Sequence, residues 1–400
     1  MTTMLTRASA RAKALPPLGL RRALLLLVLA AALWIPCVHR FLVPDRTRLE
    51  NALAERQIRA WTEPTTRAAG ALRMRAVNPE WDFMTRTFTA LGLADRIASG
   101  RLDAAATEAH VRALRAIVDD TLREDRERGQ EHFLLGYAQH GTFVDPAARS
   151  VFVDGEIVLV IAALERVSPG SGALEEARTR ATRIERAMSE SPSLSAESYP
   201  DECWTFCNTT ALAALTLLDR VENRSRYAAL AARWVAHARE HLIEPESGLL
   251  ISSYTRDGRV LDGPEGSSIW MSASNLLLFD PAFARDQYAR ARRELGRTAR
   301  GFGWATEWPT RGHSAPRALR PDVDSGAIVP GLDASAGSSG LALLGASAFD
   351  DEGFFTPLLA SLELAAVPAR DGSGYLASND VGDAVLLHAL AFGPLVRGLR

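Results

Sequence analysis

The stretch Ser198-Tyr-Pro-Asp-Glu-Cys-Trp-Thr-Phe-Cys-Asn-Thr-Thr-Ala-Leu212 changes from a polar, aromatic loop to an apolar segment. Pro200 and Asp201 are residue types that start helices, so we predict a helix from this point, with Cys207 about two turns inside it. Loops of the same kind, rich in Gly, Pro, Asp, Trp and Ser, recur along the chain, and each precedes a strongly apolar segment. The other five loops are 78–83, 153–156, 263–268, 331–335 and 378–380.

The six loops recur at the length of a helical hairpin plus its loop. Successive steps measure 45 to 72 residues, counted from Asp82, Asp154, Trp204, Ser268, Ser335 and Asp380. Between two loops lies an apolar segment, such as 157–164, and then an amphipathic one, such as 173–188. Helices buried all round would alternate with helices that have one wet face. This alternation predicts an all-α fold, an (α/α)6 toroid (six-hairpin barrel) of about twelve helices in two concentric rings.

In such a toroid the six loops meet at one mouth, where helix N-termini present free N–H groups. We expect Trp81, Trp204 and Trp270 near this mouth. Strand patterns are scarce, and the one hairpin expected joins 249–254 to Val260 around Asp257-Gly258. The irregular period leaves a helical solenoid as the alternative architecture.

The N-terminal region has the features of a membrane anchor. Residues 23–38 are uncharged and apolar, and five basic residues precede them. We divide the chain into a basic cytoplasmic N-terminus (1–22), a transmembrane helix or signal segment (23–43) and one helical domain (46–400). The basic excess predicts a single pass through the inner membrane with the domain in the periplasm. A cleaved signal peptide is the competing interpretation, although Trp34-Ile35-Pro36-Cys37 is a poor cleavage site.

Three side chains are candidates for catalysis. Cys207 can act as a nucleophile or proton donor if a neighbour tunes its pKa, or it can pack as a small hydrophobe. His140 lies in a loop rich in glycine and aromatic residues and can shuttle protons, or it can cap and pack. Asp82 has Phe83 and Phe88 nearby. An apolar setting would raise the pKa of this carboxyl and suit it to general acid work.

Other polar residues gather in the same loops. Cys203 lies close to Cys207, but a disulfide within a regular helix turn is disfavoured, and two thiols alone do not make a metal site. We therefore expect no metal site. Several carboxylates of the loops are expected to be helix caps. The carboxylates are Asp82, Asp154, Glu156, Asp201, Glu202, Glu265, Asp322, Asp324 and Asp380.

Four motifs occur in a specific order along the chain. They are Asn78-Pro-Glu-Trp-Asp-Phe-Met-Thr-Arg-Thr-Phe88, Tyr199-Pro-Asp-Glu-x-Trp204 continuing to Cys207-Asn208, Gly266-Ser-Ser-x-Trp270, and Asp322-Val-Asp-Ser-Gly326 leading to Gly331-Leu-x-Ala-Ser335. Together they resemble the linalool dehydratase-isomerase family, from near residue 46 to the C-terminus. The resemblance implies an (α/α)6 barrel exported to the periplasm and cofactor-free lyase and isomerase chemistry on terpenoid alcohols. It also implies a homo-oligomer with sites near subunit contacts.

The resemblance assigns roles to individual residues. It places Asp82 at the family's catalytic aspartate, His140 at its histidine and Cys207 at one of its cysteines. The family's tyrosine shortly after the aspartate is replaced here by Phe88, and its second cysteine falls where this chain has Ser198 or Tyr199. The residues expected to line the substrate site are Trp81, Phe88, Tyr137, Glu202, Trp204, Asn208 and Trp270.

Three functions compete. The first is an extracytoplasmic lyase or isomerase that acts on a small terpenoid or allylic alcohol, with Asp82 and Cys207 as the acid–base pair. The second is a six-hairpin glycoside hydrolase or uronate lyase that uses mouth carboxylates such as Asp82 and Glu202. The third is a catalytically inactive toroid that binds a ligand or an envelope partner. The expected partners are a small-molecule substrate and the membrane, and a net charge of −2 gives no reason to expect nucleic acid.

Overall fold

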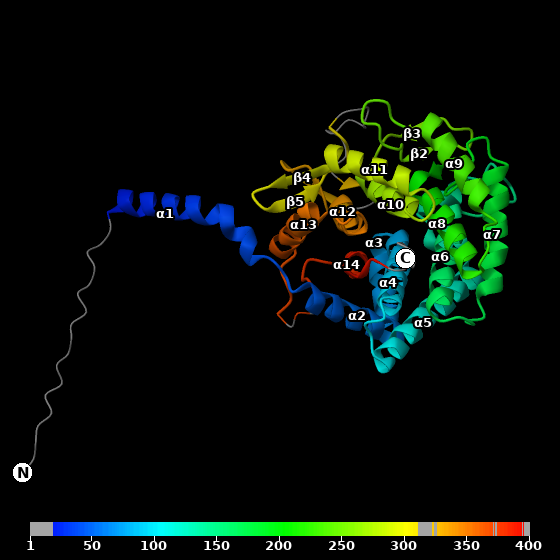
Figure 1. Cartoon of the computed structure of the whole chain (residues 1–400), viewed down its shortest axis with the longest axis horizontal. Helices are drawn as coiled ribbons and strands as arrows, with labels where there is room; N and C mark the ends of the chain where they lie inside the picture. Colours follow the sequence, from blue (N-terminus) through cyan, green and yellow to red (C-terminus); the bar gives the residue numbers. More distant parts are fainter. Residues whose placement is uncertain are drawn as a thin grey trace, which may run out of the picture.

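The inner part of the fold is a closed ring of six helices (Figure 1). The computed structural model describes residues 19–310, 322–323, 326–370, 372, 374–393 and 395. Each inner helix packs on the next, and the last packs back on the first. In ring order they are α4 (Pro79–Ala98), α6 (Val151–Val167), α8 (Thr205–Val221), α10 (Gly266–Leu276), α12 (Ala336–Ala348) and α14 (Asp380–Ala391).

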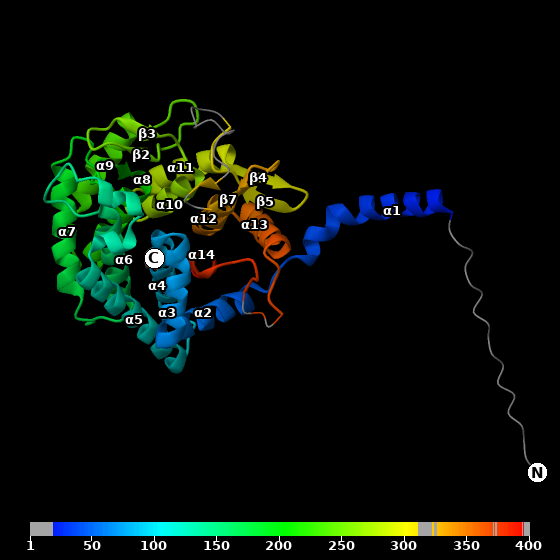
Figure 2. The same cartoon turned by 180° about the vertical axis from the view of Figure 1, so that it is seen from behind.

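A second layer of helices surrounds the ring in both views (Figures 1 and 2). The outer helices are α5 (Ala104–Arg128), α7 (Leu174–Ser189), α9 (Ala228–His241), α11 (Pro281–Glu294) and α13 (Glu352–Ala365), and α2 (Arg46–Thr62) and α3 (Pro64–Val77) complete this layer. Burial separates the two layers, because 15 of the 17 residues of α6 are buried but only 6 of the 16 residues of α7. The predicted (α/α)6 toroid is therefore confirmed.

The predicted start of the helix that carries Cys207 is wrong. Tyr199 and Glu202 form a bridge with a tight turn between them, and Asp201 has a positive φ of 56°. Cys203 and Trp204 then form β1 (Cys203–Trp204), which pairs with β2 (Ser253–Tyr254). Helix α8 begins only at Thr205, so Cys207 lies in its first turn, at the mouth. The two cysteines are free thiols.

Short strands connect the helices. The predicted hairpin is confirmed, since β2 pairs antiparallel with β3 (Val260–Asp262), and Gly258 in the turn has a φ of 93°. A second hairpin joins β4 (Gly296–Ala299) to β5 (Phe302–Ala305). A three-stranded sheet contains β6 (Asp322–Val323), β7 (Gly326–Val329) and β8 (Ala334–Ser335).

A helical segment extends from the side of the ring (Figure 1). It consists of α1 (Leu20–Trp34) and the 3-10 helix η1 (Ile35–Phe41). An 18-residue window within these 22 residues has a mean hydropathy of 2.0, and none of that window is buried in the domain. Their length and composition fit a membrane anchor or a signal sequence.

Candidate functional site

The mouth of the toroid brings together side chains from α4 and from the loops before α6 and α8. Asn78 caps α4 by accepting a hydrogen bond of 2.8 Å from the N–H of Glu80. The hydroxyl of Tyr199 donates a hydrogen bond to Oε1 of Glu80. The N–H of Leu135 donates to the same hydroxyl at 3.0 Å. Tyr199 thus ties the start of the first inner helix to the loop before the third.

Aromatic rings and a second carboxylate extend this arrangement to the surface. Tyr137 belongs to η3 (Gly136–His140), and its ring stacks on Tyr199 with the centroids 4.7 Å apart. Its hydroxyl donates to Oε2 of Glu202 at 3.0 Å, and Nε1 of Trp204 donates to the same oxygen at 3.2 Å. We call Glu80, Tyr137, Tyr199, Glu202 and Trp204 the mouth cluster.

Cys207 lies in the electrostatic field of this cluster. The residue is buried, with 5% of its surface exposed. Burial raises the pKa of the Cys207 thiol well above its usual value, and the charges of Glu80 and Glu156 act in the same direction, whereas a hydrogen bond with Ser198 opposes them. The thiol is therefore neutral at physiological pH, and it can give up its proton only transiently.

Glu156 is a second buried acid near Cys207. It lies on α6 with 1% of its surface exposed, and its Oε2 has no hydrogen-bond partner among the described residues. Burial raises the pKa of Glu156 to about 7, while the neighbouring Thr87 opposes the shift. The carboxyl also lines a cavity of about 10 Å³ beside Phe83 and Val118, which has room for about one water molecule. Glu156 can therefore hold or release a proton near neutral pH.

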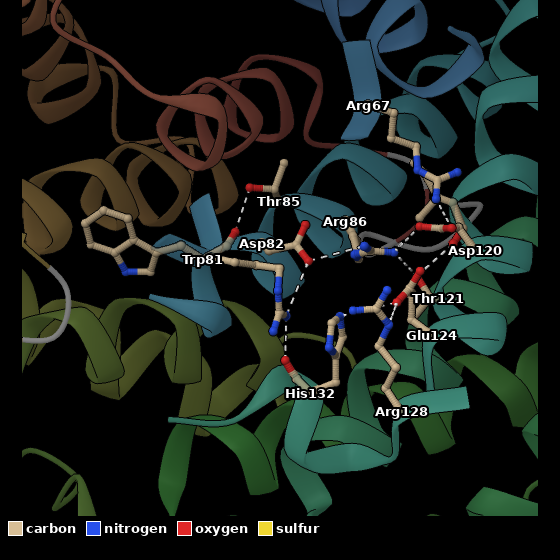
Figure 3. A network of polar contacts seen from close by, with 12 residues as sticks. Arg67, Trp81, Asp82, Thr85, Arg86, Asp120, Thr121, Glu124, Arg128 and His132 are labelled. Atoms are coloured by element: carbon tan, nitrogen blue, oxygen red, sulfur yellow. Dashed lines mark hydrogen bonds and ion pairs between the residues drawn. The ribbon is translucent and has the colours of Figure 1, made fainter. Parts of the chain in front are cut away.

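Asp82 lies in a different environment from the apolar one we predicted. Its Oδ2 accepts a hydrogen bond of 3.2 Å from Nη2 of Arg86 and is 3.9 Å from Arg75 (Figure 3). Arg86 in turn donates to Asp120 at 2.7 Å, and Arg67 pairs with the same carboxylate. This network joins α4 to α3 and α5, in the layer between the rings. The expected apolar setting of Asp82 is thus wrong.

Helical geometry explains why Glu80 rather than Asp82 joins the mouth cluster. Two positions along an α-helix correspond to a rotation of about 200°, so Glu80 and Asp82 face nearly opposite sides of α4. Glu80 contacts Tyr199, and its charge raises the pKa of Cys207, whereas Asp82 forms ion pairs with arginines. Cys207 thus experiences the charges of Glu80 and Glu156, and the Asp82 carboxylate pairs with Arg86 and Arg75.

The other candidates from the sequence are dispersed. His140 ends η3 and is exposed, in the same loop as Tyr137. Asn208 is fully buried and braces the loop before α8, because its side chain exchanges two hydrogen bonds with the backbone of Ala196 and donates a third, of 3.0 Å, to the carbonyl of Trp204. Phe88 lies in the core with its ring centroid 6.2 Å from that of His388.

The three tryptophans do not share one location. Trp81 and Trp204 are half-buried at the N-terminal ends of α4 and α8. Trp270 is fully buried instead, and its indole N–H donates to Oγ of Ser338 at 3.0 Å. Its ring packs near Tyr288 and Phe354 of the outer helices. The prediction that Trp270 lies at the mouth is therefore wrong.

Most remaining loop carboxylates have structural partners. Asp154 pairs with Arg180 and Arg183, and Asp380 pairs with Arg73. Asp324 lies outside the described residues, and of Asp322 only the backbone is described. Within the described ranges, no group of three or more His, Cys, Asp or Glu side chains is arranged to hold a metal ion.

The sequence pattern does not single out three residues of this site. Glu80 lies inside the motif that contains Asp82, Tyr199 lies where the resembling family has its second cysteine, and Glu156 is one of many loop carboxylates. The available signal is the four-residue spacing of Asp82 and Arg86, which allows Asp82 to pair on its own helix.

The chain was compared with known families, sequences and structures. The profile of the family described as linalool dehydratase/isomerase matches residues 175–380, a little more than half of the chain. This match contains Tyr199, Glu202, Trp204 and Cys207, whereas Glu80, Tyr137 and Glu156 precede it. A search of curated protein sequences found no match.

Two solved structures are similar in fold. An inactive variant of an alpha-1,6-mannanase of Salegentibacter sp. HEL1_6, in complex with alpha-1,6-mannotetrose, has a TM-score of 0.53 and 10% identity, over 87% of this chain and 99% of that one. Cellobiose 2-epimerase from Bacillus thermoamylovorans has a TM-score of 0.47 and 12% identity, over 77% of this chain and 86% of that one. The mannanase supports the toroid fold alone.

Proposed function

This chain belongs to the linalool dehydratase/isomerase family, and from that premise we propose that it dehydrates or isomerises a small terpenoid or other allylic alcohol without a cofactor. The observation that carries the proposal is the buried Cys207 thiol in the first turn of α8, which burial and the charge of the Tyr199-bound Glu80 carboxylate keep neutral. An acid and a base are thereby available at one mouth.

The chemistry requires two proton movements. In a dehydration, an acid protonates the leaving hydroxyl, the C–O bond breaks, and a base removes a proton from the neighbouring carbon so that a C=C bond forms. We assign the acid to the Cys207 thiol and the base to Glu80. Glu156, which titrates near neutral pH, supports proton return to this pair.

An allylic substrate also explains how one site performs two reactions. Loss of water from an allylic alcohol leaves positive charge shared between two carbons. Loss of a proton from this cation gives a diene, whereas return of water to the other carbon gives the isomeric alcohol. Aromatic faces stabilise cations, and Tyr137 and Trp204 of the mouth cluster supply such faces beside Glu202.

We also propose that the toroid works outside the cytoplasm, in the periplasm. The basic residues before α1 favour a cytoplasmic N-terminus, and the apolar segment Leu20–Phe41 is long enough to cross a bilayer once. A periplasm-active reporter fused after residue 45 should be active. Activity of a cytoplasm-only reporter at the same junction would reverse the topology.

One observation favours a second candidate, a glycoside hydrolase. Glu80 and Glu202 are two carboxylates among Tyr137, Tyr199 and Trp204, and aromatic rings with paired carboxylates also suit sugar hydrolysis. The solved structure of similar fold is an inactive alpha-1,6-mannanase variant in complex with alpha-1,6-mannotetrose.

The test of the proposal is a direct comparison of substrates. Purified full-length chain should convert a tertiary allylic alcohol to a diene and to the primary isomer, as measured by gas chromatography, and should leave alpha-1,6-linked manno-oligosaccharides intact. Release of sugar without conversion of the alcohol would favour the hydrolase. Binding of either compound without turnover would favour the inactive toroid.

A further inference from the structure

The end of the apolar segment is docked on the toroid. The ring of His39 in η1 lies edge-on to Phe302 of β5, with the centroids 6.3 Å apart. It also lies against Gly301, where an added Cβ would overlap the His39 ring, and Gly301 has a φ of 83°. Helix α13 also contacts η1. The position of the toroid relative to the segment is therefore set by packing.

The length of the segment fixes where this contact lies in a bilayer. The 15 residues of α1 and the 7 residues of η1 span about 36 Å at the usual rises of about 1.5 and 2.0 Å per residue. The hydrocarbon core is about 30 Å thick. When α1 crosses the bilayer, His39 and Phe41 consequently lie at its boundary, and the β4–β5 hairpin lies there with them.

Exposed apolar side chains lie at the end of α13 and in the loop that follows it. Leu364, Val367 and Leu376 have 57%, 51% and 71% of their surfaces exposed. Val367 has a φ of 56°, which is a strained conformation for a β-branched residue, and its carbonyl accepts a hydrogen bond of 2.9 Å from the N–H of Leu376. The loop therefore holds two large apolar side chains outward at a conformational cost.

This loop lies beside the chain that leaves the membrane segment. Both views place the segment between α13 and α14 next to the connection from η1 to α2 (Figures 1 and 2). A Cβ added at Gly372 would lie 3.5 Å from the guanidinium of Arg48, which belongs to the first turn of α2. Basic residues are exposed near the same contact, namely Arg40, Arg48, Arg300 and Arg370. We call Leu364, Val367, Leu376, Arg300 and Arg370 the anchor flank.

We propose that the anchor flank rests on the surface of the bilayer that α1 crosses. Its leucine and valine side chains would enter the boundary between head groups and acyl chains, and its arginines would contact lipid phosphates. Only Leu42 to Asp45 separate η1 from α2, so the flank cannot move far from the membrane. The view in Figure 1 runs through the ring, and α1 extends sideways from it. If α1 crosses the bilayer, the mouth would therefore open parallel to the membrane surface.

The test measures the depth of single labelled positions in the full chain. Cys37 is replaced by serine so that it is not labelled, and Cys203 and Cys207 are buried. An environment-sensitive fluorophore is then attached to the cysteine introduced by Val367→Cys. Val260→Cys is the matched control, because Val260 is 52% exposed on the β2–β3 hairpin, away from α1 in both views. The chain is reconstituted in phosphatidylcholine–phosphatidylglycerol vesicles, with or without bromine on the acyl chains.

The expected result is that brominated lipid reduces emission at position 367 at least about twofold and leaves position 260 unchanged. Leu376→Cys repeats the measurement where the backbone is not left-handed. Equal behaviour at 367 and 260 would overturn the proposal. Shielding at position 367 that depends on the protein-to-lipid ratio but not on bromine would also overturn it, because that result would indicate contact with a second copy of the chain. Failure of the chain to float with the vesicles would overturn it as well.

Discussion

Tyr199 donates a hydrogen bond to Glu80 across 119 positions of sequence. This bond joins the N-terminal turn of α4 to the loop before α8, and Cys207 follows that loop within one helical turn. Burial and the Glu80 charge both raise the pKa of the Tyr199 hydroxyl, so it keeps its proton and donates at physiological pH. The bond orients Glu80 toward the mouth.

The first prediction is that Tyr199→Phe lowers turnover of the allylic alcohol by roughly tenfold to a hundredfold, because Glu80 loses the donor that orients it. Tyr288→Phe is the matched control, since the Tyr288 hydroxyl donates to Asp351 at 2.9 Å between outer elements. Both variants should lose similar stability, and only Tyr199→Phe should lose kcat. Equal kcat in the two variants would remove Glu80 from the mechanism.

The second prediction concerns Asp82 as a structural residue. Asp82→Asn should lower the free energy of unfolding by roughly 3 to 5 kcal/mol, because it leaves the buried Arg86 without one of its carboxylates. Asp286→Asn breaks a pair with the same four-residue spacing, Asp286 with Arg290, whose side chains are 42% and 37% exposed. It should cost less than about 1 kcal/mol. An Asp82→Asn variant with unchanged stability and abolished turnover would instead support the catalytic role first expected from the sequence.

The third prediction is a pH dependence of stability caused by Glu156. Burial raises its folded-state pKa from 4.5 to about 7, so the folded chain binds the proton more tightly than the unfolded chain. The stabilisation by this proton is complete below pH 4.5 and is lost as the pH rises through 7, at a cost of roughly 3 kcal/mol. Glu156→Gln should therefore be more stable than the parent at pH 8 in urea titrations.

Glu165 on the same helix provides the control for Glu156. Burial acts to raise its pKa, but hydrogen bonds from Ser171 and from the N–H groups of Gly170 and Ser171 hold the pKa below its usual value. The stabilisation of the folded chain by ionised Glu165 is present above the unfolded-state pKa of this carboxyl, and it is lost as the pH falls through the folded-state pKa. Glu165→Gln should therefore be less stable than the parent at pH 8, with the opposite sign to Glu156→Gln. The same sign in both variants would refute this account of Glu156.

The fourth prediction assigns Asn208 to the scaffold. Asn208→Ala removes three hydrogen bonds to the backbone of Ala196 and Trp204 and should cost roughly 2 to 4 kcal/mol. Amide hydrogen exchange in residues 196–204 should accelerate, whereas exchange in the β4–β5 hairpin should not. Loss of turnover with unchanged exchange would assign Asn208 to substrate binding instead.

The sequence predicted the ring but not the direction of its side chains. Six loops, each before an apolar segment, were sufficient for the toroid, because burial all round is visible in composition. The direction in which each side chain of a helix points is harder to predict from the sequence. Trp270 follows a mouth loop by only a few residues and yet points into the layer between α10 and the outer helices, where Ser338 accepts its N–H.

The residues of the candidate site could not all be predicted from the sequence, for a related reason. Asp82 and Glu80 share one motif. The Asp82–Arg86 pair is local to α4, but the contacts of Asp82 with Arg75 of α3 and of Glu80 with Tyr199 come from other parts of the chain. Pro200 and Asp201 resemble a helix start, but they lie in a tight turn, and the pairing of Cys203 with Tyr254 makes the residues after this turn a strand. Long-range contacts of this kind leave no local pattern.

The most direct measurement of the central claim is the turnover of the Cys207→Ser variant beside that of Cys203→Ser. Both thiols are buried, and Cys203 instead directs its Sγ to the carbonyl of Ser195 at 3.8 Å. Each substitution keeps volume and polarity but removes a thiol proton. We predict that Cys207→Ser lowers kcat at least about a hundredfold with a nearly unchanged Tm, and that Cys203→Ser keeps its turnover. Wild-type turnover by Cys207→Ser, with a lowered Tm, would contradict the account and leave Cys207 as a packing residue.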